Sequence, residues 1–147
     1  MFYCKLQIFI YMKQFIKKLI REYFEDDYDF PSFDDLDSFS SKLKKEKEKL
    51  KKLPDTIRLY RLILADSPDS IDFKKPGSHY SMDKDNLIKK HSFLKGKKYY
   101  LIVVDASKNL ININATAENN VNFPSEKEIT LKNNGQNAKI ISITEIK

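Results

Sequence analysis

Hydrophobic residues recur at helical spacing near the start of the chain. Between residues 5 and 24 the apolar side chains fall on one side of a helix and the basic side chains on the other. The pattern predicts an amphipathic helix that covers an apolar flank of the main domain; a partner-binding helix and contact with a membrane surface are the alternatives. Residues 25–37 are acidic and aromatic and contain Pro31, which predicts a connecting loop.

A second helix is predicted over residues 38–53, where Pro54 ends it. Residues 42–52 of this segment are mostly lysine with few apolar positions. A run of this kind is usually the solvated face of a helix, and the alternative is an electrostatic patch for nucleic acid or an acidic target. Residues 1–53 are therefore expected to form an N-terminal helical segment.

After Pro54 the apolar spacing changes to that of β-strands. One helix is predicted over residues 83–92, and strands are predicted over residues 57–65, 79–82, 99–105, 110–114, 126–132 and 139–146. These elements indicate an α+β fold in which N-terminal helices pack on a mixed or antiparallel sheet. Residues 54–147 would form the β-rich part of one compact domain, since 147 residues suffice for one core.

Composition narrows the classes of function. A net charge of +6 suits a polyanionic ligand such as nucleic acid, a dinucleotide or an acidic lipid surface. The single cysteine, Cys4, excludes an intramolecular disulfide, and with only two histidines no metal site is expected. Lys5 and Lys13 interrupt the apolar N-terminus well short of the roughly 20 residues that span a bilayer. We therefore expect a cytoplasmic protein without a membrane partner.

The predicted strand over residues 57–65 carries a charge on its apolar face. Alternation puts Arg61 on the same side as Leu59 and Ile63, so a guanidinium interrupts an apolar stripe. Because burial of an unpaired charge is costly, Arg61 needs an anionic partner. That partner is either a carboxylate within the protein or a ligand phosphate, which a planar guanidinium recognises well.

Two further segments carry polar side chains. If residues 126–132 form a strand, Glu126 and Glu128 point to the same side, roughly 6.5 to 7 Å apart. Taken alone, this pair is typical of a solvated edge strand. Residues 77–81 predict a turn that leads into a short strand bearing a hydroxyl group, and His79 within it is either catalytic or structural.

In their order along the chain, these segments resemble the three motifs of the arginine-serine-glutamate class of ADP-ribosyltransferases. Leu59-Tyr60-Arg61 resembles the Tyr-Arg motif of the first strand. Residues 77–81 resemble the second motif, with Ser81 in the position of the serine, and residues 124–131 are similar to the Glu-x-Glu strand. The resemblance covers about residues 57–147 and implies a split β-sheet of the ADP-ribosyltransferase type.

The resemblance also implies a substrate, NAD, and a role for each motif. Arg61 would hold the diphosphate of NAD. Glu128 would stabilise the positive charge that develops on the ribose as nicotinamide leaves, and Glu126 would accept a proton from the attacking group. Ser81 would hold Glu128 or the nicotinamide ribose by a hydrogen bond. The other NAD-binding residues implied by the motifs are Tyr60, Gly77 and His79.

The same resemblance implies a protein target. A loop over residues 114–125 would contact the target, with Phe123 and Ser125 as substrate-binding residues. A glutamate at the first position of Glu-x-Glu implies arginine as the leading acceptor. The expected function is therefore mono-ADP-ribosylation of an unidentified protein, with release of nicotinamide.

Two other functions stay open. Tyr80-Ser81-Met82 stands where the family has Ser-Thr-Ser, which is compatible with a noncatalytic interaction module that keeps the fold. The lysine run over residues 42–52 is compatible with a basic protein that binds nucleic acid.

Overall fold

The computed structural model describes residues 33–147, so the helix predicted over residues 5–24 and most of the loop predicted over residues 25–37 lie outside the described residues. Asp37–Lys147 form one compact unit. Within the described part of the chain, no helix is both long and apolar enough to cross a membrane. The elements are α2 (Phe33–Lys51), β1 (Thr56–Leu64), η1 (Pro68–Ser70), β2 (His79–Ser81), α3 (Lys84–Lys90), β3 (Tyr99–Ser107), η2 (Lys108–Leu110), α4 (Ile113–Asn122), β4 (Glu128–Thr130), η3 (Lys132–Gly135) and β5 (Lys139–Ile146).

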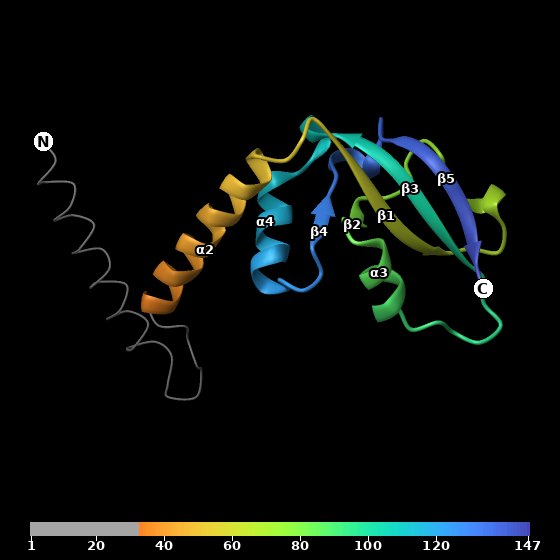
Figure 1. Cartoon of the computed structure of the whole chain (residues 1–147), viewed down its shortest axis with the longest axis horizontal. Coiled ribbons are helices and arrows are strands. Elements are labelled where there is room, and N and C mark those ends of the chain that lie inside the picture. Colours follow the sequence, from red (N-terminus) through yellow and green to blue (C-terminus); the bar gives the residue numbers. More distant parts are fainter. Residues whose placement is uncertain (1–32) are drawn as a thin grey trace, which may run out of the picture. The chain divides into compact units, whose positions relative to one another are not determined.

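The five described strands form an antiparallel sheet in the order β4-β2-β1-β3-β5 (Figure 1). β1 pairs with β3 along its whole length, from Thr56 opposite Ser107 to Leu64 opposite Tyr99. β2 pairs with β4 over its three residues but with β1 only where Tyr60 lies opposite Ser81. The predicted α+β class is thus confirmed, and every strand pair is antiparallel.

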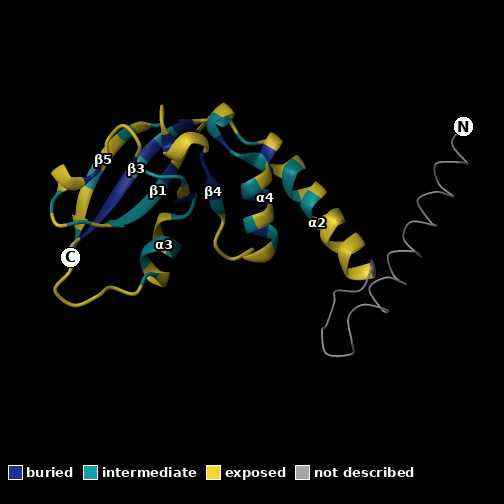
Figure 2. Ribbon diagram, turned by 180° about the vertical axis from the view of Figure 1, so that it is seen from behind, coloured by how far each residue is buried: buried dark blue, intermediate teal, exposed yellow. Residues whose placement is uncertain are grey.

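The buried residues of β1 and β3 form most of the core. Ile57 and Leu59 are buried on β1, while Arg58 between them is exposed and pairs with Asp105. Along β3 burial is almost continuous (Figure 2). Most of the buried apolar strand residues belong to the same cluster as Leu50 of α2 and Ala117 of α4, so both helices are attached to the sheet through the core.

Most predicted elements are present, with shifted ends. The strands predicted at 57–65, 79–82, 99–105 and 139–146 correspond to β1, β2, β3 and β5, and the helix predicted at 83–92 corresponds to α3. The helix predicted to begin at residue 38 begins at Phe33, so the end of the predicted loop is helical. Asp34 and Asp35 lie in its first turn, where carboxylates interact favourably with the helix dipole.

The strand predicted over residues 110–114 is wrong. Ile111 forms only an isolated bridge to Leu131, and α4 begins at Ile113. The Asn112 side chain accepts a hydrogen bond from the Ala115 amide and so caps the helix. The cap opposes the strand propensity of the isoleucines, and the packing of Thr116 and Ala117, which are 0% exposed, favours the helix. The loop predicted over residues 114–125 is therefore mostly helix.

The strand predicted over residues 126–132 is too long, because β4 contains only Glu128–Thr130. Lys127 has a φ of 47°, a left-handed conformation that turns the chain immediately before the strand. The strand alternation predicted for Glu126 and Glu128 therefore does not apply. The turn is tied to α3, since Asn86 Nδ2 and Lys90 Nζ donate hydrogen bonds to the Ser125 carbonyl at 3.1 and 3.3 Å.

Candidate functional site

One cavity brings together most of the predicted site residues. Its volume is about 470 Å³, within the range of roughly 300 to 1,000 Å³ of small-molecule sites. It is lined by Tyr60, Arg61 and Leu62 of β1, by all three residues of β2, by Asn86, Leu87, Lys90 and His91 in or after α3, and by Glu126 and Glu128. Gly77, Phe123 and Ser125 do not line it, so six of the nine predicted site residues share this cavity.

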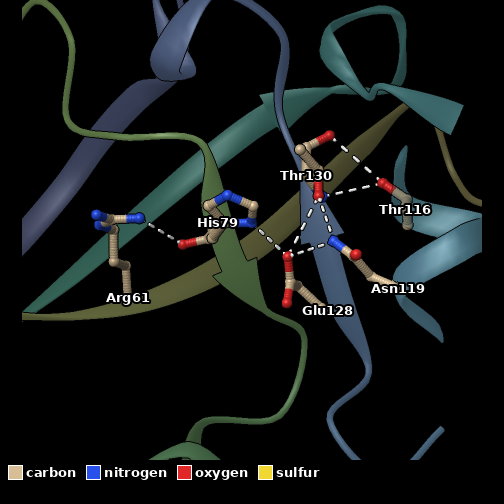
Figure 3. A network of polar contacts seen from close by, with 6 residues as sticks. All are labelled: Arg61, His79, Thr116, Asn119, Glu128 and Thr130. Carbon is tan, nitrogen blue, oxygen red and sulfur yellow. Dashed lines mark hydrogen bonds and ion pairs between the residues drawn. The ribbon is translucent and has the colours of Figure 1, made fainter. Parts of the chain in front are cut away.

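Glu128 lies at the centre of a polar network (Figure 3). Its Oε1 atom is in hydrogen-bond contact with His79 Nδ1 and accepts hydrogen bonds from Asn119 Nδ2 at 2.9 Å and Thr130 Oγ1 at 3.3 Å. The second oxygen points away from these partners. With a side chain that is 20% exposed, Glu128 offers one oxygen for a ligand while the other is held by the protein.

The support for this carboxylate comes from α4. The Thr116 hydroxyl accepts a hydrogen bond from the Thr130 amide at 2.9 Å and donates to the Thr130 carbonyl at 3.4 Å. Asn119 contacts Thr130 as well as Glu128. The sequence prediction missed both α4 residues because it assigned this region to a strand and a loop. Asn112 as a capping residue, followed by Thr116 and Asn119 at spacings of four and three, could have indicated a helix with these two side chains on one face.

Arg61 lacks a carboxylate partner among the described residues. Its Nη1 donates a hydrogen bond to the His79 carbonyl at 2.9 Å, and its Cζ lies 5.9 Å from the centre of the Tyr80 ring. The Nε atom is buried and has no hydrogen-bond partner among residues 33–147. The intramolecular carboxylate considered from the sequence is therefore not found in residues 33–147, and no carboxylate of these residues neutralises the positive charge.

Gly77 makes room for this arginine. A Cβ atom at Gly77 would lie 2.5 Å from Arg61 Cζ, and the φ of Gly77 is 119°. A side chain at Gly77 would therefore have to displace the Arg61 guanidinium, and the backbone conformation also favours glycine. Gly77 and Arg61 also line a second cavity of about 500 Å³, which Lys75 and Lys97 line as well. Gly77 acts on the first cavity through Arg61 and does not line it.

The Ser81 hydroxyl does not bind Glu128, which is one of the two contacts that the resemblance implies for it. Ser81 lies opposite Glu128 in the β2-β4 register, but its hydroxyl donates to the Asp83 carbonyl at 3.1 Å and accepts from the Asp83 amide at 3.0 Å. Asp83 caps α3, and the hydrogen bond from the Asn86 amide holds the pKa of Asp83 below its usual value. His79 and Asn119 make the contacts to Glu128 that were expected of Ser81.

Three predicted residues belong to the segment before β4: Glu126 lines the cavity, whereas Phe123 and Ser125 do not. Glu126 is exposed, and Phe123 is 59% exposed. Ser125 contributes its carbonyl to the bonds with α3. After α3, the His91 ring lies edge-on to Phe93 and Tyr99, with ring centres 5.0 and 4.9 Å away, and lends an aromatic wall to the cavity.

Comparisons with models of protein families, with curated proteins and with solved structures found no match for this chain. The site is therefore interpreted from its residues and their geometry.

Proposed function

We propose that the protein is a mono-ADP-ribosyltransferase that transfers ADP-ribose from NAD to a protein, with an arginine side chain as the acceptor. The observation that carries the proposal is that Arg61, His79 and the pair Glu126 and Glu128 line one cavity although they come from separate parts of the sequence. These are the positions at which the chain resembles the motifs of that class of enzyme.

The distribution of charge in the cavity suits NAD. The guanidinium of Arg61, which has no carboxylate partner within the described residues, matches the NAD diphosphate in charge and geometry. The rings of Tyr60 and His91 supply aromatic surface for the bases. A carboxylate at Glu128 provides the negative charge required beside the ribose.

The reaction breaks the bond between the ribose and the nicotinamide nitrogen. The electron pair of this bond leaves with the nicotinamide, so positive charge develops on the ribose, and the unengaged oxygen of Glu128 stabilises it more in the transition state than in the ground state. An acceptor nitrogen then forms the new bond to the ribose. It loses a proton to Glu126, whose exposed carboxylate also pairs favourably with a guanidinium.

The test follows released nicotinamide and label transferred from NAD in a cell lysate and to a small guanidine compound. We expect both signals from the wild type and a loss of at least about 100-fold in Glu128→Gln, because an electrostatic contact to the transition state is removed. Glu118→Gln is the matched control, since Glu118 is an exposed glutamate of α4 that does not line the cavity. It should retain wild-type activity.

Unfolding curves of the variants separate chemistry from folding. A Glu128→Gln variant that folds but is inactive supports the proposal. Wild-type protein that releases no nicotinamide with water, guanidine or lysate as acceptor contradicts it and favours the noncatalytic interaction module.

A further inference from the structure

Glu128 is held from a helix that contributes no residue to the cavity. α4 does not line the cavity, yet Asn119 Nδ2 lies 2.9 Å from Glu128 Oε1 and 3.3 Å from Thr130 Oγ1. Thr130 Oγ1 in turn contacts Glu128 Oε1 at 3.3 Å. Asn119 therefore reaches the carboxylate both directly and through Thr130.

The position of Asn119 is itself fixed. Asn112 caps the first turn of α4, and buried Thr116 binds both backbone groups of Thr130. These contacts fix α4 to β4 at Thr130, two residues after Glu128. An amide on a helix that is fixed in this way has little freedom to follow a carboxylate that rotates.

We infer that Asn119 is a positioning residue for Glu128, an inference that rests on the proposed function. It holds Oε1, so the other oxygen, which points away from the network, is left for the reacting ribose. The role expected of a motif serine thus belongs to an asparagine outside the three motifs, because the Ser81 hydroxyl is engaged with Asp83. A displacement of about 1 Å at a reacting centre can lower a rate about 100-fold.

The chain offers a matched control in the next residue. Asn120 is also on α4 and is 8% exposed, and its Nδ2 donates to a carboxylate, Glu46 Oε1 on α2, at 3.3 Å. Asn120→Ala therefore removes the same kind of hydrogen bond from the same helix without touching Glu128. A role of Asn119 in folding alone predicts the same behaviour for both alanine variants.

The experiment measures kcat and KM for nicotinamide release from NAD by full-length protein. We expect Asn119→Ala to lower kcat about 10-fold to 100-fold with KM within about twofold, because the lost contact orients the catalytic group and does not bind NAD. Asn120→Ala should keep kcat within about twofold of the wild type. Asn119→Asp, which keeps the shape but replaces the donor by an oxygen, should lose at least as much as Asn119→Ala.

A second measurement tests whether Asn119 acts through Glu128. In the Glu128→Gln background, Asn119→Ala should change the residual rate by less than about twofold, since residues that act as a unit have strongly non-additive effects. An additional loss as large as in the wild-type background would overturn the positioning role.

The other outcomes are also decisive. An active wild type with an unchanged kcat in Asn119→Ala overturns the inference and leaves the proposed function standing, as does a change confined to KM. Equal losses of kcat in Asn119→Ala and Asn120→Ala would assign the effect to folding of α4. A wild type that releases no nicotinamide removes the proposed function and this role together.

Discussion

The two sides of the sheet are held together differently. The long ladder, defined as β1, β3 and β5, has strands of 9, 9 and 8 residues that pair almost continuously. The short edge, defined as β2 and β4, has strands of 3 residues each. Continuous backbone pairing, with apolar burial on β1 and β3, stabilises the long ladder. The short edge buries Tyr80 and Ile129 but pairs over few residues, and it has additional side-chain contacts from α3 and α4.

This difference separates stability from chemistry. Most strand residues that are 0% exposed belong to the long ladder, namely Leu59, Ile102, Val104 and Ala106; Ile129 of β4 is the exception. Glu128 and His79, which are in contact with each other, belong to the short edge. Substitutions of the buried apolar residues of the long ladder should therefore act mainly on the free energy of unfolding. Substitutions at the short edge, and of Arg61 on the cavity side of β1, should act mainly on ligand binding and turnover.

The largest effect on stability is expected from Leu59→Ala. Leu59 is 0% exposed on β1, so truncation removes buried apolar surface and leaves a cavity that lowers the free energy of unfolding by about 2 to 5 kcal/mol. Urea unfolding measures this loss. Leu64→Ala on the same strand is the control, because Leu64 is 50% exposed and should lose less than about 1 kcal/mol. Equal losses in the two variants would contradict the assignment of the core to the long ladder.

An intermediate effect is expected from Gly77→Ala, which should lower both the free energy of unfolding and the affinity for NAD. The added Cβ would lie 2.5 Å from Arg61 Cζ at a φ of 119°, so it strains the backbone by about 1 to 3 kcal/mol and displaces the guanidinium. We expect the Kd for NAD, measured by calorimetry, to rise at least about 10-fold, equivalent to a loss of about 1.4 kcal/mol.

Gly96→Ala is the control for Gly77→Ala. Gly96 has a φ of 76°, but a Cβ there would meet no atom within 4 Å. It should lose stability through backbone strain while its Kd for NAD stays within about twofold of the wild type. Unchanged NAD binding in Gly77→Ala would exclude Arg61 from the NAD site.

The smallest effect is expected from Tyr80→Phe. The Tyr80 hydroxyl is buried without a hydrogen-bond partner, and burial raises the pKa of Tyr80 from 10.0 to about 12. Because the folded pKa is above the unfolded one, this contribution to stability is complete below pH 10 and is lost as the pH rises toward 12. Tyr80→Phe should therefore change stability at pH 7 by less than about 1 kcal/mol and lose less than the wild type at pH 11.

Urea unfolding at pH 7 and pH 11 tests this expectation. Tyr99→Phe is the control, since the Tyr99 hydroxyl accepts a hydrogen bond from the Leu94 amide at 3.0 Å. Its removal should cost about 1 kcal/mol at pH 7. A larger loss in Tyr80→Phe than in Tyr99→Phe would show that the Tyr80 hydroxyl is satisfied.

Local pattern predicted the long ladder well and the surroundings of the short edge poorly. Alternation around Leu59 predicted β1. It also identified Arg61 as a charged residue on the apolar face of that strand, and Arg61 does line the cavity. The region from residue 110 to 127 was misjudged, because isoleucines with strand propensity stand beside Asn112, whose capping hydrogen bond starts a helix. Propensity and capping conflict there, and only packing decides between them.

Within residues 33–147, the sequence by itself determined the strands of the long ladder, the lysine-rich helix and the polar residues from which the site is built. Tertiary structure decided their partners: it turned Ser81 toward Asp83, left Arg61 without a carboxylate and brought His79 and Asn119 to the same oxygen of Glu128. The periodicity of a segment reflects which of its own faces is buried. Contacts between distant segments depend on strand register and on the position of a helix, which no local pattern records.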